Sequence, residues 1–224
     1  MPDTRQQIAE YYDNVYAEGV QPAYPPEFTR HVVHNLCDRA RVVHGARVLD
    51  VGCGTGLYSA LLDERGYDVT GIDISETGIR KAKEYYPHIR FEVQDATALP
   101  YPRGHFDFIF AFGVSVANTH DLNAIRSWFE HLLSVTRTGG TVAFLGGSNL
   151  SGGSTETSDW INHSWNDIRS IVPRTLQDAQ GPWLSHFRLM KSLHPALSMN
   201  GATTQALRFL PFSFERRIVL FLRK

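Results

Sequence analysis

The chain has 224 residues, of which 42% are hydrophobic and 20% are charged. This composition is typical of a folded globular domain and excludes collagen-like, coiled-coil and disordered chains. The formal net charge is -1, whereas a protein that binds duplex nucleic acid normally carries a large basic face. We therefore expect a single domain over residues 1–224, without nucleic acid as a partner.

The cysteines and histidines give no metal-site pattern. Cys37 and Cys53 do not form a CxxC pair, and His31 and His34 share a helix face without a third ligand nearby, so we expect no metal. The first residues are polar, unlike a secretory signal, and no apolar stretch approaches the roughly 20 residues of a membrane-spanning helix. These features predict a cytoplasmic protein without a membrane partner.

Short apolar segments alternate with helical patterns over the first two thirds of the chain. The predicted strands are residues 47–52, 67–74, 89–95, 106–112 and 141–147. The predicted helices are residues 57–66, 76–86 and 121–135. Because parallel strands need crossover connections, this alternation predicts an α/β, doubly wound and mostly parallel sheet that binds ligands at the carboxyl ends of its strands.

The segments outside this core are expected to form three further parts. Residues 1–46 are a predicted N-terminal helical cap. Residues 148–200 begin with a Gly/Ser/Thr-rich stretch and are a predicted helical insertion over the ligand edge, with helices near 160–172 and 183–194. Residues 201–224 contain the strand-like segments TTQALRFL and RRIVLFLR, which are expected to pair as an antiparallel hairpin.

A glycine-rich motif, VLDVGCGTG at residues 48–56, follows the first predicted strand. Gly52, Gly54 and Gly56 allow a tight turn and let a ligand lie against bare backbone near the start of a helix. The dinucleotide fingerprint needs its third glycine at the position of Leu57. A nicotinamide-dependent oxidoreductase is therefore the weaker alternative.

Carboxylates stand at three strand ends. Asp73 can accept both hydroxyls of a ribose, Asp95 ends the third strand, and Asp50 precedes the glycines, where it can orient the loop or meet an ammonium group. Taken singly, these residues are equally well explained as turn or helix-capping residues. Together they would repel a phosphate and attract a cation, so their joint placement favours a binding site.

Five segments, VLDVGCGTG, GIDIS, VQDATALPY, FDFIFAFG and RTGGTVAF, resemble in order the successive motifs of the class I S-adenosylmethionine-dependent methyltransferases. The resemblance spans about residues 47–147, the expected cofactor-binding core. It implies a Rossmann-like, seven-stranded sheet with an antiparallel last strand, S-adenosylmethionine as cofactor and S-adenosylhomocysteine as product. The cofactor-binding residues that it indicates are Tyr12, Asp50, Gly52, Cys53, Gly54, Gly56, Asp73, Ile74, Asp95, Ala96 and Phe112.

Two residues are candidate catalytic groups. Tyr12 lies in an aromatic N-terminal segment that resembles the one folding over the cofactor in many such enzymes, and a tyrosine face attracts a sulfonium cation; simple helix packing is the alternative. His120 follows the fourth strand and is the first candidate for a general base, which a hydroxyl acceptor needs. His163 and His186 are second choices for that base.

The insertion supplies the candidate substrate-binding residues, which are Trp160, His163, Trp165, Arg169 and Trp183. They can form a pocket wall, or equally an ordinary core or a dimer face. The predicted function is methyl transfer to an oxygen or nitrogen of a small molecule, by a monomer or homodimer. A methyltransferase-like binding or scaffold module that has lost catalysis is the alternative.

Overall fold

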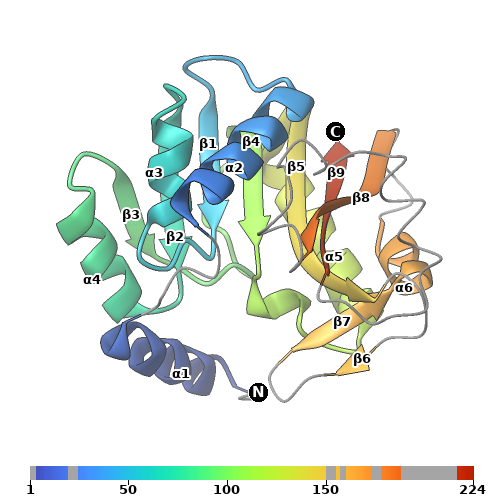
Figure 1. Cartoon of the computed structure of the whole chain (residues 1–224), viewed down its shortest axis with the longest axis horizontal. Helices are drawn as coiled ribbons and strands as arrows, with labels where there is room; N and C mark the ends of the chain where they lie inside the picture. The colour runs from blue at the N-terminus through green and yellow to red at the C-terminus, as the bar shows by residue number, and fades with distance from the viewer. Residues whose placement is uncertain (1–3, 20–24, 150–154, 157–159, 173–177, 188–215) are drawn as a thin grey trace.

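The computed structural model describes residues 4–19, 25–149, 155–156, 160–172, 178–187 and 216–224 (Figure 1). Five parallel strands form the centre of the sheet in the order β3-β2-β1-β4-β5. Their bounds are β1 Arg47–Val51, β2 Asp68–Asp73, β3 Arg90–Val93, β4 Phe106–Phe112 and β5 Thr136–Asn149. All five strands predicted from the sequence are confirmed.

The sheet continues beyond β5 through β9 (Arg216–Arg223), which is antiparallel to β5, and β8 (Asp178–Phe187), which is antiparallel to β9. The expected antiparallel last strand is therefore confirmed. At its carboxyl end β5 also pairs with β7 (Ile161–Ser164), and β7 pairs with β6 (Thr155–Glu156). This second branch lies beside the loop that follows β4.

Helices cover both faces of the sheet (Figure 1). Their bounds are α1 Arg5–Glu18, α2 Pro26–Ala40, α3 Leu57–Asp63, α4 Glu76–Tyr85, α5 Leu122–Val135 and α6 Trp165–Ser170, with a short 3-10 helix η1 at Ser115–Ala117. Val48 and Phe108 point toward α2, α3 and α4, whereas their neighbours Leu49 and Ile109 point toward α5. Because both faces are covered, the central strands are apolar almost throughout rather than at alternate positions.

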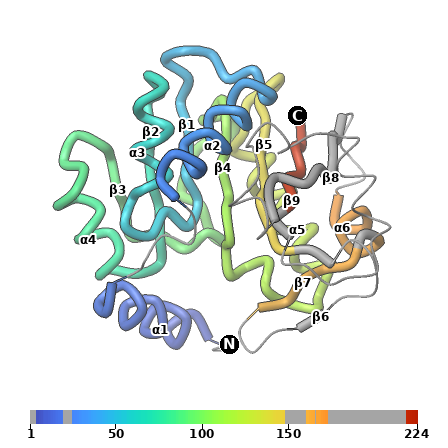
Figure 2. Tube along the Cα trace, viewed as in Figure 1, coloured from blue at the N-terminus to red at the C-terminus, as the bar shows by residue number. Residues whose placement is uncertain are grey.

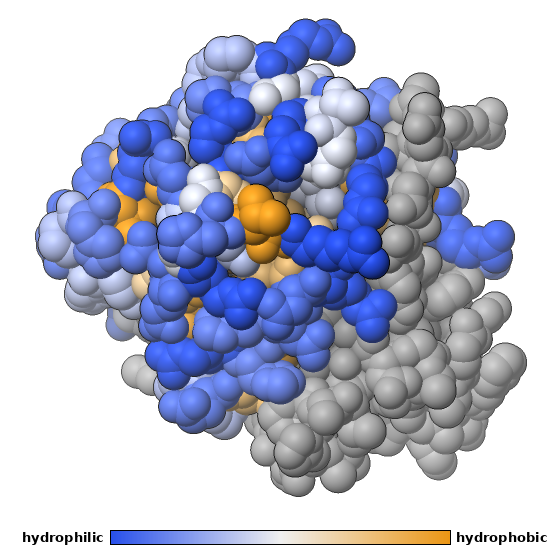
Figure 3. Space-filling view, turned by 90° about the horizontal axis from the view of Figure 1, so that it is seen from above, coloured by the Kyte–Doolittle hydropathy of each residue, from blue (hydrophilic) through white to orange (hydrophobic). Residues whose placement is uncertain are grey.

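The N-terminal helices have different environments. The α2 helix buries Val33, Leu36 and Cys37 against the sheet. In contrast, α1 has no buried residue and lies across the carboxyl ends of the strands, beside the start of α4 (Figure 2). Among the residues coloured in Figure 3, the opposite end of the molecule is largely hydrophilic with scattered hydrophobic side chains. Because α1 lies at the carboxyl ends of the strands, it covers the edge of the sheet at which a ligand was expected to bind.

Two predictions for the later part of the chain are corrected by the structure. Residues 183–187 belong to β8 rather than to a helix, because β9 offers them a strand edge to pair with. Residues 161–164 form β7, so the helix expected over 160–172 is limited to α6. The segment TTQALRFL and residues 188–194 lie outside the described residues, and the described antiparallel partners of β9 are β5 and β8.

Candidate active site

A cavity of about 180 Å³ opens at the carboxyl ends of the central strands. Its walls come from α1, from the ends of β1 and β2, and from the segments that follow β3 and β4. The lining residues are Arg5, Ile8, Tyr12, Tyr16, Gly52, Ile72, Asp73, Ile74, Gln94, Asp95, Ala96, Thr97, Gly113, Val114, Ser115 and Val116. The fold thus brings six of the predicted cofactor residues to one place, which are Tyr12, Gly52, Asp73, Ile74, Asp95 and Ala96.

Asp73 ends β2 and is only 6% exposed. Its Oδ2 accepts the backbone N–H of Gly54 at 2.9 Å, and its Oδ1 accepts that of Ser75 at 2.9 Å. Burial raises the pKa of the carboxyl, and the backbone hydrogen bonds partly oppose this effect. Asp73 therefore joins the glycine loop to the start of α4 while it lines the cavity. The cap of α4 is Ser75, whose side chain accepts the Gly78 N–H.

Asp50 is almost completely buried and does not line the cavity. Its Oδ2 accepts the hydroxyl hydrogen of Ser59, on α3, at 2.6 Å. The pKa of Asp50 is raised to about 7, mainly by burial and also by the charge of the nearby Asp73. The hydrogen bond from Ser59 opposes this rise. The side chain thus connects β1 to α3 behind the glycine loop.

The three motif glycines meet different neighbours. Gly52 faces the cavity. A Cβ on Gly54 would lie 2.8 Å from the hydroxyl of Tyr16, and a Cβ on Gly56 would lie 2.9 Å from the ring of Phe91. Gly54 and Gly56 therefore allow close approach of protein side chains rather than lining the cavity.

Cys53 and Phe112 likewise do not line this cavity. Cys53 is buried, and burial raises the pKa of its thiol. An apolar, protonated thiol of this kind is a packing group rather than a nucleophile. Phe112 stacks edge-on against Tyr58, with ring centroids 5.0 Å apart.

Two tyrosines of α1 face the cavity. The rings of Tyr12 and Tyr16 stack with centroids 6.0 Å apart. The hydroxyl of Tyr12 hydrogen-bonds Ser115, and burial raises the pKa of this phenol to about 12. The ring of Tyr16 fills the space left by two glycines, since a Cβ on Gly78 would lie 2.9 Å from it and a Cβ on Gly54 would lie 2.8 Å from its hydroxyl.

Polar contacts attach α1 at both ends. Asp13 accepts the Ser75 hydroxyl at 2.5 Å and the Thr77 N–H at 2.9 Å, and Lys81 donates to the carbonyl of Tyr16 at 2.5 Å. Each of these contacts crosses more than 60 positions of sequence, so no local pattern indicates them.

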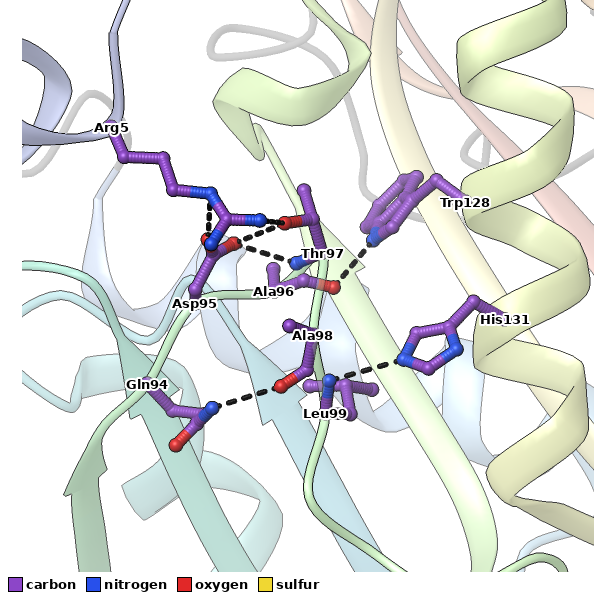
Figure 4. Close-up of polar contacts among 9 residues, drawn as sticks. All are labelled: Arg5, Gln94, Asp95, Ala96, Thr97, Ala98, Leu99, Trp128 and His131. Atoms are coloured by element: carbon purple, nitrogen blue, oxygen red, sulfur yellow. Dashed lines mark hydrogen bonds and ion pairs between the residues drawn. The ribbon is translucent and has the colours of Figure 1, made fainter.

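At the other end of α1, Arg5 contacts the segment that follows β3 (Figure 4). Its Nε lies 2.6 Å from Oδ2 of Asp95, and its Nη2 donates to the Thr97 hydroxyl at 2.8 Å. Arg5 was not predicted as a site residue, because its contact with Thr97 spans 92 positions of sequence.

The predicted catalytic and substrate residues are distributed unevenly. His120 is exposed and lines neither the cofactor cavity nor the hollow beside Gly113. His163 is buried, with Nε2 3.0 Å from the Ala117 carbonyl, and lines a small hollow together with Trp160 beside Gly113. Arg169 is exposed on α6. The side chains of Trp165, Trp183 and His186 lie outside the described residues.

The described ranges contain neither a cluster of metal ligands nor a membrane-spanning helix. No group of three or more His, Cys, Asp or Glu side chains is arranged there to hold a metal ion. None of the helices in the same ranges combines the length and the apolar character needed to cross a bilayer.

Comparison with known proteins shows similarity to methyltransferases. Residues 48–140 match the family described as a methyltransferase domain. The chain is 34% identical over 113 residues to a demethylmenaquinone methyltransferase of Renibacterium salmoninarum, covering 50% of this chain and 46% of that protein. It is 32% identical over 148 residues to a malonyl-acyl-carrier-protein O-methyltransferase of Erwinia pyrifoliae, covering 66% and 52%. Over residues 48–140 the chain is therefore similar to a methyltransferase domain.

The chain spans about half the length of these two curated relatives. Among solved structures, the magnesium protoporphyrin IX methyltransferase of Synechocystis PCC 6803 with bound S-adenosylmethionine aligns with a TM-score of 0.61 at 16% identity, covering 100% of this chain and 99% of that one. The cyclase SpnF aligns with a TM-score of 0.65 at 18% identity, covering 99% and 97%. Because a cyclase shares the fold, the activity has to be argued from the site.

Proposed function

We propose that the chain transfers the methyl group of S-adenosylmethionine to an oxygen or nitrogen of a small-molecule acceptor. The observation that carries this proposal is the convergence of Asp73 and Asp95 on one cavity at the carboxyl ends of β2 and β3. Among the described lining residues, two carboxylates stand against one arginine, Arg5, and this balance favours a cationic nucleoside over a dinucleotide phosphate. The similarity to a methyltransferase domain supports the same cofactor.

The proposed binding mode assigns one part of the cofactor to each wall. Asp73 accepts the ribose hydroxyls, as carboxylates at this position do in nucleotide-binding sheets. Asp95 accepts the adenine amino group, and Ile74 and Ala96 flank the base with apolar side chains. Gly52 lets the methionine part approach the backbone. Asp50, Gly54 and Gly56 support the loop from behind.

In the proposed reaction the protein mainly supplies position and a dry environment. S-adenosylmethionine supplies an electrophilic methyl group when it is bound. Ile8 and Tyr12 of α1 shield this cavity from water, and the Tyr12 ring offers an aromatic face to a sulfonium. Among the described residues that line the cavity none is a histidine, and acceptors that are nucleophilic without a protein base, such as a neutral amine or an acidic hydroxyl, fit this lining.

The acceptor is proposed to enter from the side of β7 and Trp160. Trp160 and His163 line a hollow that shares Gly113 and Val114 with the cofactor cavity. The shared wall supports this proposal, because methyl transfer requires the acceptor to lie next to the cofactor. On this proposal His163 contacts the acceptor, and the exposed His120 is not its base. A cytoplasmic monomer or homodimer with a small-molecule substrate remains part of the proposal.

Calorimetry and a transfer assay test the proposal together. The chain should bind S-adenosylmethionine and S-adenosylhomocysteine, and should move label from a tritiated methyl donor to a component of a metabolite library. Binding of NAD alone would contradict the cofactor assignment. Cofactor binding without transfer to any acceptor would favour the scaffold alternative, and conversion of a substrate without methylation would indicate a reaction of another class.

A further inference from the structure

The segment that follows β3, residues 94–99, lies between the cavity and α5 (Figure 4). On one side, Gln94, Asp95, Ala96 and Thr97 line the cavity. On the other side, two α5 side chains contact its backbone. The indole N–H of Trp128 donates to the Ala96 carbonyl at 3.1 Å, and the Leu99 N–H donates to Nε2 of His131 at 3.0 Å.

The contact from Trp128 reaches the carboxylate of Asp95 through a single peptide unit. The Ala96 carbonyl belongs to the peptide whose N–H is that of Thr97. This N–H donates to Oδ1 of Asp95 at 2.7 Å, and the Thr97 hydroxyl donates to the same atom at 2.7 Å. The indole, the peptide and the carboxylate thus form one chain of hydrogen bonds. Since a peptide is planar, holding its carbonyl also fixes the direction of its N–H.

The other oxygen of Asp95 is covered by Arg5. Oδ2 is buried and accepts no hydrogen bond from the described residues. Its neighbour is the Arg5 guanidinium, with Nε at 2.6 Å, in an ion pair whose arginine side chain is largely exposed. Because a carboxylate oxygen has two lone pairs, Oδ2 can accept an N–H from the cavity once the exposed Arg5 side chain moves aside.

Packing alone does not explain a tryptophan at this position. Trp128 is 4% exposed, and its ring packs against Phe129 and Phe144 with centroids 5.3 and 6.2 Å away. A phenylalanine would fill most of this space without a polar atom to satisfy, whereas a buried indole N–H needs an acceptor. The acceptor that it finds is the carbonyl next to Asp95.

We infer that Trp128 is a positioning residue for nucleobase recognition, acting on the Asp95 carboxylate through the Ala96–Thr97 peptide. This inference rests on the proposed function. A carboxylate held in this way accepts the amino group of adenine and disfavours hypoxanthine, which presents a carbonyl oxygen at the same position. Trp128 therefore increases the preference of the site for adenine.

The test compares S-adenosylhomocysteine with its analogue containing hypoxanthine, by calorimetry on the whole chain. The wild type should prefer the adenine compound. Trp128→Phe, which keeps an aromatic ring in the core and removes the N–H, should lower this preference by about threefold to tenfold, the range of one hydrogen bond. Phe129→Leu is the matched control: it disturbs the same aromatic cluster, and it should lower the melting temperature without changing the base preference.

Nuclear magnetic resonance gives a second measurement, which uses the wild-type protein and therefore does not depend on whether a variant folds. Among the four tryptophan indole signals, that of Trp128 should shift more on addition of S-adenosylhomocysteine than on addition of the hypoxanthine analogue. An unchanged base preference in Trp128→Phe, or equal shifts with both compounds, would overturn the inference. Failure of the wild type to bind S-adenosylhomocysteine at all would instead contradict the proposed function.

Discussion

Replacing Asp73 by asparagine should separate cofactor binding from stability. The carboxylate accepts two buried backbone N–H groups, those of Gly54 and Ser75, and asparagine can accept only one of them well. Loss of a hydrogen bond to a charged acceptor costs about 1.5–3 kcal/mol. However, burial raises the pKa of Asp73, so the substitution also removes an unfavourable buried charge. We expect these contributions largely to cancel in the free energy of unfolding.

The affinity for cofactor has no such compensation. A neutral amide replaces a charged acceptor for the ribose hydroxyls, and its oxygen has to serve the backbone as well. We expect the dissociation constant for S-adenosylhomocysteine to rise by about 30- to 150-fold, which corresponds to about 2–3 kcal/mol. Isothermal titration calorimetry measures this change, and urea unfolding measures stability on the same sample.

Asp107→Asn is the matched control at the opposite end of the sheet. Asp107 accepts the Arg47 N–H at 2.7 Å and also pairs with Arg137. Although burial raises the pKa of Asp107, these contacts lower it overall, so its charge is favourable in the fold. This variant should lose about 1 kcal/mol of stability and keep its cofactor affinity. An unchanged affinity in Asp73→Asn would refute the assignment of Asp73 to the ribose.

Three other predictions follow from the site. Gly78→Ala should destabilise the wild type, because its Cβ would lie 2.9 Å from the Tyr16 ring. In a Tyr16→Ala background the same substitution should stabilise the fold by up to about 1 kcal/mol through helix propensity. Urea unfolding of the wild type, the two single variants and the double variant measures this reversal of sign. Lys81→Met should speed amide exchange in α1 and release of S-adenosylhomocysteine, because it removes the contact with the Tyr16 carbonyl. The control Lys83→Met, at an exposed position, should change neither rate. Equal exchange in both variants would contradict the role of Lys81 in attaching α1. The pKa of Asp50 is raised to about 7 in the fold, so its contribution to stability is greatest below its unfolded pKa of about 4 and is lost as the pH rises toward 7. The unfolding free energy of Asp50→Asn should therefore exceed that of the wild type increasingly between pH 5 and 8, by up to about 4 kcal/mol. Parallel pH profiles of the two proteins would refute this prediction.

The central sheet was predictable because burial of its strands is visible directly in their amino-acid composition. Strands such as β1 and β4 are buried on both faces, and this requires nearly continuous apolar sequence that ends at glycine or at a polar residue. The carboxyl ends of parallel strands must meet at one edge. The convergence of Asp73 and Asp95 on one cavity therefore followed from their positions in the sequence alone. The cap of α5 is equally local: Asp121 accepts N–H groups only two and three residues away.

The sequence was less informative where a residue's role depends on a distant neighbour. Asp50 and Gly54 belong to the same motif as Gly52, yet Asp50 faces Ser59 and Gly54 faces Tyr16. The strand β8 carries a pattern that is equally compatible with a helix, and pairing with β9 decides between them.

The sequence by itself determined the α/β order of elements, the glycine loop and the edge at which a ligand binds, because apolar periodicity and turn residues act over a few positions. Only the tertiary structure decided which of the motif residues face the cavity, how Asp13 and Lys81 attach α1, and that Trp128 reaches the peptide beside Asp95. The physical reason is that hydrogen bonds and close packing act over a few ångströms in space. Residues far apart in the chain become partners only after the sheet has brought them together.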